Sequence, residues 1–166
     1  MGLWGVGLLA SLLAFPVQAG DSPLVVGQPP PALALQDLDG NTVSLDSVRG
    51  SIVVLDFWAS WCGPCRIELP LLSAMQDQHR DAGLKVLAVN VDTETSLRDA
   101  FLARNPVQLT ILDDSSQATI AAYQVEKMPT TVVVDREGKV HAVHYGFDKA
   151  SFAALRGEVD ALLKTE

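Results

Sequence analysis

The stretch that decides the fold is residues 52–66, IVVLDFWASWCGPCR. It begins with a run of β-branched and aromatic residues, Ile52 to Trp58, which predicts a fully buried strand. A helical pattern follows from Cys62 to about Ala82, and Gly83 ends it. The two cysteines of the chain, Cys62 and Cys65, therefore stand where a buried strand passes into a helix.

The spacing of these two cysteines predicts a redox pair. The Cys62 sulfur would lie at the helix N-terminus, where free backbone N–H groups and the helix dipole favour a thiolate. The Cys65 sulfur would follow about one turn later on the same face, close enough for a disulfide. A purely structural disulfide is disfavoured, because so short a loop restricts the unfolded chain little.

A Cys-x-x-Cys pair can also form part of a zinc site, which requires four ligands. The only further candidates are His79, His141 and His144. His141 and His144 are separated by an odd number of residues in an expected strand, so they point to opposite faces. We expect all three histidines at the surface and no metal site.

The remaining chain alternates strand and helix patterns. Expected elements are a hairpin of residues 32–35 and 42–45, strands at 85–90, 109–112, 130–134 and 140–145, and helices at 95–104, 117–123 and 150–164. Pro70 should kink the helix that follows Cys65, because proline removes a backbone donor. This order predicts one α/β domain with a central mixed β-sheet flanked by helices.

The N-terminal segment is apolar and uncharged, and it predicts export. Residues 1–19 match a secretory signal peptide with a cleavage site at residues 17–19, and an uncleaved N-terminal membrane anchor is the alternative. Either would place the rest of the chain in the periplasm or another extracytoplasmic space. Residues 20–31 are a Pro-rich lead-in that should form an extended linker, and residues 32–166 form the domain.

The composition excludes several classes of protein. The chain has 166 residues, of which 48% are hydrophobic, so intrinsic disorder is excluded, and two cysteines are too few for a disulfide scaffold. Twelve basic against 20 acidic residues give a net charge of -8. No basic surface is therefore expected for nucleic acid.

Further motifs accompany the cysteine pair: Glu68 and Pro70, then MPTT at 128–131 and DREG at 135–138. With residues 56–66, they make the chain resemble the thioredoxin superfamily, and within it the TlpA-like and ResA-like exported thiol-disulfide oxidoreductases. The resemblance covers about residues 33–163. It implies a thioredoxin-like fold, to which the predicted N-terminal β-hairpin is an extension.

The resemblance also assigns roles to four residues. Cys62 would be the exposed nucleophile, and Cys65 the buried thiol that resolves the mixed disulfide. Pro129 would be the family's cis-proline beside the cysteine loop. Asp56 would be a buried proton acceptor for Cys65 with a pKa raised by desolvation, and the alternative is a surface acid at the end of a strand.

Substrate contacts would come from the residues around this loop. They are Trp61, Gly63, Pro64, Met128 and Thr130. Trp58 either lines the site or belongs to the core. Ala88 stands where cytoplasmic thioredoxins pair the buried aspartate with a lysine, so Asp56 should titrate higher or act alone.

The dipeptide Gly63-Pro64 predicts a reductant. It is the pair found in thioredoxin, whose potential is about -270 mV, whereas strongly oxidising relatives carry a histidine there. A reductant outside the cytoplasm needs a membrane electron donor, and its clients would be proteins with disulfides or cysteine pairs awaiting haem or copper. No cofactor is expected. The alternatives are a disulfide oxidase or isomerase, and a module that carries Cu(I) on its thiolates.

Overall fold

A computed structural model describes residues 24–165, and the expected signal peptide or anchor at residues 1–19 lies outside this range. Within the range no helix combines the length and apolar character needed to cross a bilayer. The strands are β1 (Ala34–Asp37), β2 (Thr42–Ser44), β3 (Ile52–Trp58), β4 (Leu84–Asn90), β5 (Thr110–Asp113), β6 (Thr130–Val134) and β7 (Val140–Tyr145). The helices are α1 (Gly63–His79), α2 (Thr95–Arg104), α3 (Ala118–Ala122) and α4 (Lys149–Lys164), with 3₁₀ turns at Asp46–Val48 and Arg80–Ala82.

The strands form one mixed sheet in the order β2-β1-β5-β4-β3-β6-β7. β3, β4 and β5 run parallel, while β6 pairs antiparallel with β3 and with β7. The N-terminal hairpin is part of the same sheet, because β1 pairs antiparallel with both β2 and β5. The predicted mixed sheet with a hairpin extension is therefore confirmed.

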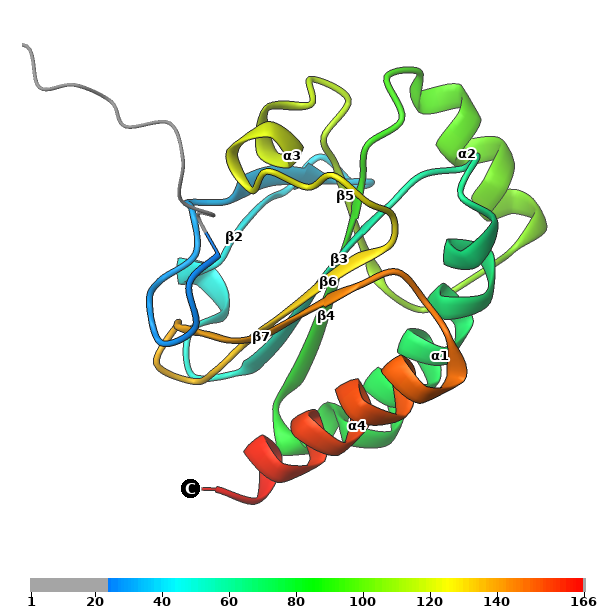
Figure 1. The fold of residues 1–166 in the computed structure, drawn as a ribbon. Coiled ribbons are helices and arrows are strands. Elements are labelled where there is room, and N and C mark those ends of the chain that lie inside the picture. Colours follow the sequence, from blue (N-terminus) through cyan, green and yellow to red (C-terminus); the bar gives the residue numbers. More distant parts are fainter. Residues whose placement is uncertain (1–23, 166) are drawn as a thin grey trace, which may run out of the picture.

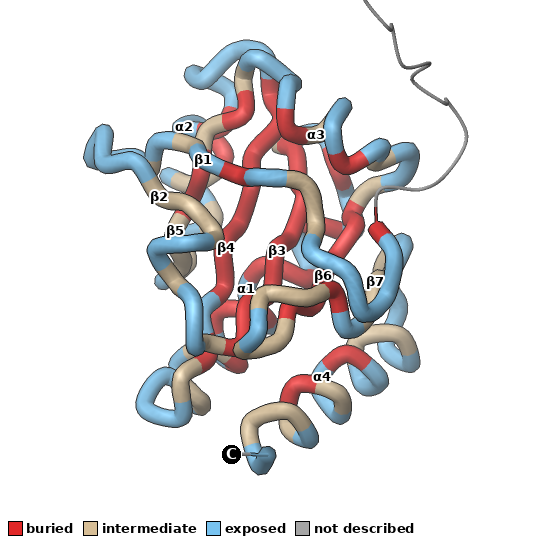
Figure 2. The backbone as a smooth tube through the Cα atoms, turned by 90° about the vertical axis from the view of Figure 1, so that its left-hand side faces the viewer, coloured by how far each residue is buried: buried red, intermediate tan, exposed pale blue. Residues whose placement is uncertain are grey.

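Helices α1 and α4 lie side by side over one face of the sheet (Figure 1). Leu72 of α1 and Leu155 and Val159 of α4 pack there on Val54 of β3 in one apolar cluster. The opposite side of β3 carries Phe57, whose ring lies 5.1 Å from that of Tyr123, just after α3. Since every residue of β3 is buried, as the red tube in Figure 2 shows, this strand forms the centre of the core.

The helix that follows the cysteines has the predicted extent. α1 continues through Pro70 to His79, and a 3₁₀ turn carries the chain to Ala82. Gly83 then adopts a left-handed conformation, with φ of 90°, which glycine reaches without a steric penalty. The stop signal in the sequence therefore acts where it was predicted.

The Pro-rich lead-in is held against the domain where the structure describes it. Gly27 N–H donates to Val140 O over 2.8 Å, and Val140 N–H donates to Gln28 O over 2.9 Å, so this segment pairs with the first residue of β7. Further along, the Tyr123 hydroxyl donates to Pro31 O over 2.7 Å. Residues 27–31 are therefore attached at both ends to the domain that follows them.

Two of the three histidines are not the exposed surface residues that the sequence predicted. His79 at the end of α1 lies 3.1 Å from the Asp160 carboxylate, and His144 of β7 lies 2.8 Å from that of Glu158. Both rings are half-buried because α4 packs over them, and only His141 is exposed. The expectation failed because a strand and a helix pattern do not show which residues a distant helix will cover.

Candidate functional site

The two cysteines form a disulfide at the junction of β3 and α1. Their sulfur atoms are 2.01 Å apart. Cys62 is the N-cap of α1, its Sγ accepts a hydrogen bond from Cys65 N–H over 3.2 Å, and its own N–H donates to Ala59 O. The first sulfur thus lies against free N–H groups at a helix N-terminus, the environment that stabilises a thiolate after reduction.

The cysteine expected to be exposed is buried. Cys62 is 4% exposed and Cys65 is 0% exposed in this disulfide-bonded state. The surface beside them is formed by Trp61, which is 70% exposed, and by the exposed Gly63 and Pro64. The prediction of an exposed Cys62 was wrong for this state, because its side chain turns inward to cap the helix.

The Met128–Pro129 peptide bond is cis. It directly precedes β6, whose first residue, Thr130, pairs with Phe57 near the end of β3 that leads to the cysteines. Pro129 is buried, its carbonyl accepts a hydrogen bond from Gly146 N–H, and Met128 is half-buried against the apolar cluster that contains both cysteines. The predicted cis-proline segment therefore lies at the same end of the sheet as the disulfide.

Two residues considered for substrate contact are buried instead. Thr130 is 0% exposed and its hydroxyl donates to Lys127 O over 2.7 Å, so its side chain offers no surface to a client. Trp58 is also completely buried, with its ring 5.1 Å from that of Phe101. Trp58 therefore belongs to the core. Among the residues expected to contact substrate, Thr130 is the one whose side chain is completely buried.

Two buried carboxyl groups meet at one hydroxyl on the face of the sheet that α1 covers. Thr131 of β6 is the register partner of Asp56 on β3, and its Oγ1 lies 3.4 Å from Asp56 Oδ1. The same Oγ1 lies 3.3 Å from Oε1 of Glu68 on α1. The other oxygen of each carboxyl, Asp56 Oδ2 and Glu68 Oε2, is buried without a hydrogen-bond partner among the described residues.

This environment raises both pKa values. Burial is the main cause that raises the pKa of Asp56 well above its usual value, the Glu68 charge adds to it, and the Thr131 hydrogen bond opposes it. Burial raises the pKa of Glu68 to about 7, again against the Thr131 hydrogen bond. Ala88 is the neighbour of Asp56 on β4, so no lysine is present there. The predicted buried position and raised pKa of Asp56 agree with the structure, but Asp56 does not stand alone.

Glu68 was not among the residues for which the sequence predicted a role. A signal was present: Glu68 is three residues after Cys65, on the helix face that also contains Leu69 and Leu72, both buried. A glutamate at such a position is expected to be exposed unless it finds a partner. That partner, Thr131, comes from a strand that is more than 60 residues away in the sequence, so the helical pattern alone could not show it.

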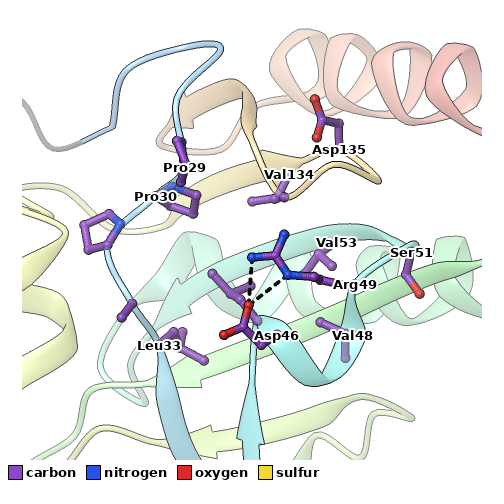
Figure 3. Close-up of a pocket in the computed structure, with 14 residues that line it drawn as sticks. Pro29, Pro30, Leu33, Asp46, Val48, Arg49, Ser51, Val53, Val134 and Asp135 are labelled. Carbon is purple, nitrogen blue, oxygen red and sulfur yellow. Dashed lines mark hydrogen bonds and ion pairs between the residues drawn. The ribbon is translucent and has the colours of Figure 1, made fainter.

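A pocket of about 240 Å³ lies away from the cysteines (Figure 3). It is lined by Pro29 and Pro30 of the lead-in and by Val53 near the start of β3, whereas the disulfide follows the end of that strand. Arg49, on its wall, is engaged by the Asp46 carboxylate at 2.8 Å. The pocket is therefore separate from the redox site. Across residues 24–165 no three His, Cys, Asp or Glu side chains are grouped in a way that could hold a metal ion.

Comparison with known proteins identifies the family. The family model described as AhpC/TSA matches residues 26–143, which include every residue of the site described above. The chain belongs to the AhpC/TSA family. Within that family, it is 32% identical over 143 residues to the thiol-disulfide oxidoreductase ResA of Geobacillus thermodenitrificans (strain NG80-2), covering 84% of this chain and 82% of that protein.

Two further comparisons agree. ResA of Bacillus subtilis (strain 168) is 31% identical over 130 residues, covering 78% of this chain and 73% of the relative. The crystal structure of a thiol:disulfide interchange protein DsbE from Chlorobium tepidum superposes with a TM-score of 0.81 at 41% identity, covering 84% and 99% of the two chains. This member of the AhpC/TSA family is therefore a ResA-like thiol-disulfide oxidoreductase with a thioredoxin-like fold, and its cysteine pair is the redox pair.

Proposed function

We propose that this protein reduces disulfides of client proteins in the periplasm or another extracytoplasmic space. The observation that carries the proposal is the position of Cys62 as the N-cap of α1, where its sulfur accepts the Cys65 N–H. The loop between the cysteines is Gly63-Pro64, as in thioredoxin, and it supplies no histidine that would stabilise the thiolate strongly. A thiolate of moderate stability is easily oxidised, as a reductant requires.

The reaction proceeds by two thiol-disulfide exchanges. The Cys62 thiolate attacks one sulfur of the client disulfide, the client S–S bond breaks, and a Cys62–client mixed disulfide forms with release of the first client thiolate. Cys65 then loses its proton to the buried carboxyls, and its thiolate attacks Cys62 Sγ. The Cys62–Cys65 disulfide forms and the second client thiolate leaves, so two electrons have passed to the client.

Asp56 is proposed as the group that accepts the Cys65 proton. It lies on the face of β3 that α1 covers, and burial raises its pKa well above the usual value, so it binds a proton more readily than an exposed aspartate. Pro129 is proposed to border the loop on the side of β6.

Client contact is proposed for the exposed surface around the disulfide. Trp61 is the largest apolar side chain there, and Gly63 and Pro64 continue the surface along the first turn of α1. Met128, before the cis bond, packs against the apolar cluster that contains both cysteines. A client segment would lie between Met128 on one side and Trp61, Gly63 and Pro64 on the other. Thr130, which the family resemblance assigned to substrate contact, does not belong to this surface because its side chain is buried.

The proposed reductase activity requires an electron donor and a client. A reductant in an oxidising compartment must be reduced again, so we propose a membrane electron donor that exchanges with Cys62–Cys65. The clients are proposed to be cysteine pairs that must be reduced before haem attachment, in cytochrome c maturation, or before copper insertion. Residues 1–19 are proposed to direct export as a signal peptide or to tether the protein to the membrane.

The redox potential tests the direction of electron flow. The purified protein is equilibrated with glutathione or thioredoxin of known potential, and the fraction of Cys62–Cys65 disulfide is measured. We expect a value near that of thioredoxin, about -270 mV, whereas a value near about -120 mV would mark an oxidant and overturn the proposal.

Trapping tests the client. A Cys65→Ser variant cannot resolve the mixed disulfide, so clients should stay bound to Cys62 and be identified by mass spectrometry. The matched control carries Cys62→Ser as well and should capture nothing. A Cys65→Ser variant that forms no mixed disulfide with any exported protein would count against a reductase of protein clients.

A further inference from the structure

The Thr131 hydroxyl stands between two carboxyl groups that otherwise have no hydrogen-bond partner among the described residues. Its Oγ1 is 3.4 Å from Asp56 Oδ1 and 3.3 Å from Glu68 Oε1, and all three residues are at most 3% exposed. A hydroxyl has one proton and two lone pairs. It can therefore donate to one of the two carboxyls only.

The second contact becomes a hydrogen bond only if the other carboxyl donates. That carboxyl must then be protonated, with its O–H directed to a lone pair of Thr131 Oγ1. Two ionised carboxylates around one hydroxyl would leave one of them with a buried and unsatisfied charge, at a high cost in free energy. One proton held in common by the two carboxyls removes this cost.

We propose that Asp56, Thr131 and Glu68 form a single unit that holds one proton, and that the Thr131 hydroxyl is the bridge over which this proton moves between the two carboxyls. In one state the Glu68 carboxyl donates to Thr131, which donates to the Asp56 carboxylate. Transfer along these two hydrogen bonds leaves Asp56 protonated and Glu68 ionised, with the hydroxyl directed the other way. Thr131 is thus a positioning residue, because it acts through the carboxyls.

Among the described residues, the elements packed against this unit bring two further titratable groups near it. On β4 the neighbour of Asp56 is the uncharged Ala88. On β7 the register partner of Thr131 is His144, whose ring nitrogen lies 2.8 Å from the Glu158 carboxylate of α4. From α1 the unit meets Glu68 itself, whose charge adds to the raised pKa of Asp56. Since His144 and Glu158 contact each other, the proton of the unit is assigned to Asp56, Thr131 and Glu68.

The unit would give the Cys65 proton a path out of the core. This consequence rests on the proposed function. Asp56 lies on the central strand, whereas Glu68 lies on the outer helix next to Ile67, which is 59% exposed. A proton taken up at Asp56 could pass over Thr131 to Glu68 and leave on the α1 side, so that Asp56 is ready for the next cycle.

The first test needs no client. Infrared spectra of the oxidised wild-type protein near pH 7 should show the carbonyl stretch of one protonated carboxyl per chain, absent from the double variant Asp56→Asn/Glu68→Gln. Either no such band or a band for two protonated carboxyls would overturn the proposal.

The second test removes the hydroxyl and keeps the shape. In Thr131→Val the infrared band should shift in frequency, because the proton loses its acceptor. The pH midpoint for reduction of Cys62–Cys65 by a small dithiol should rise by roughly half to one pH unit, the equivalent of one lost hydrogen bond. Thr131→Ser, which keeps the hydroxyl, should restore both values. A folded Thr131→Val variant with the wild-type band and midpoint would refute the bridge.

The design separates this inference from the proposed function. If Thr131→Val does not fold, Thr131→Ala is a second variant without the hydroxyl. The number of protonated carboxyls in the wild-type protein, measured by infrared spectroscopy, depends on neither variant. If the bands and midpoints behave as expected but the protein reduces no client, the proposed function fails alone. If clients are reduced but Thr131→Val matches the wild type, the proton bridge fails alone.

Discussion

Replacing Glu68 with glutamine should change how the stability of the protein depends on pH. The pKa of Glu68 rises from 4.5 to about 7 on folding, so the folded state binds more protons than the unfolded state between these pH values. The contribution of Glu68 to stability is therefore largest below pH 4.5 and is lost as the pH rises through 7. The loss corresponds to about 3 kcal/mol, because one pKa unit is about 1.4 kcal/mol.

Glutamine cannot ionise, so Glu68→Gln escapes this loss. Urea unfolding of the oxidised protein at several pH values should show a wild-type stability that falls more steeply from pH 4.5 to 8 than that of the variant. The difference between the two curves should change by about 3 kcal/mol over this range. Removing the Glu68 charge also lowers the pKa of Asp56, which acts in the same direction.

The matched control is Glu126→Gln, which removes a carboxylate at an exposed position. Its difference from the wild type should stay constant with pH. A constant offset in Glu68→Gln would reflect packing or a lost hydrogen bond, which does not depend on pH. Parallel wild-type and Glu68→Gln curves from pH 4.5 to 8 would show that Glu68 ionises freely in the fold and would refute the reasoning.

Three further substitutions test the site and the core. Trp61→Ala should slow reduction of a protein disulfide by roughly tenfold, as expected for loss of a large exposed contact, with no change in reactivity toward a small dithiol; equal losses with both would argue against client contact. Tyr123→Phe should lower the free energy of unfolding by about 1 kcal/mol in urea, since its hydrogen bond to Pro31 O is lost, and an unchanged midpoint would show that the lead-in adds nothing through this bond. Leu155→Ala should cost about 2–5 kcal/mol because it leaves a cavity under α4, and a smaller cost would mean that α4 closes over the gap.

Helices and strands could be predicted from the sequence where their own residues show a clear pattern of apolar positions or a clear stop signal. The apolar run Ile52–Trp58 became the central strand, and Gly83 ended the first helix where expected. The hairpin predicted from residues 32–35 and 42–45 is present as β1 and β2, at residues 34–37 and 42–44. Its place beside β5 was not predicted, because pairing between distant strands depends on the whole sheet and leaves no mark in either segment.

The residues of the site also fall into those that could be predicted from the sequence and those that could not. The cysteine pair was predicted from its spacing, whereas buried Asp56 and the cis bond before Pro129 were predicted from the family resemblance. Glu68 and Thr131 were not, because their burial arises only when α1 is laid over β3 and β6. The inward turn of Cys62 was missed for a related reason: it depends on the capping geometry of the folded helix.

The pairing of residues 27–28 with Val140 has a consequence for how this protein behaves in solution. β7 is the last strand of the sheet, and both the N–H and the C=O of Val140 are satisfied by the lead-in. A chain shortened to begin at residue 32 would uncover these groups at the sheet margin, which is where a second chain can add a strand. The proline-rich lead-in thus covers part of a sheet edge that would otherwise be open to pairing.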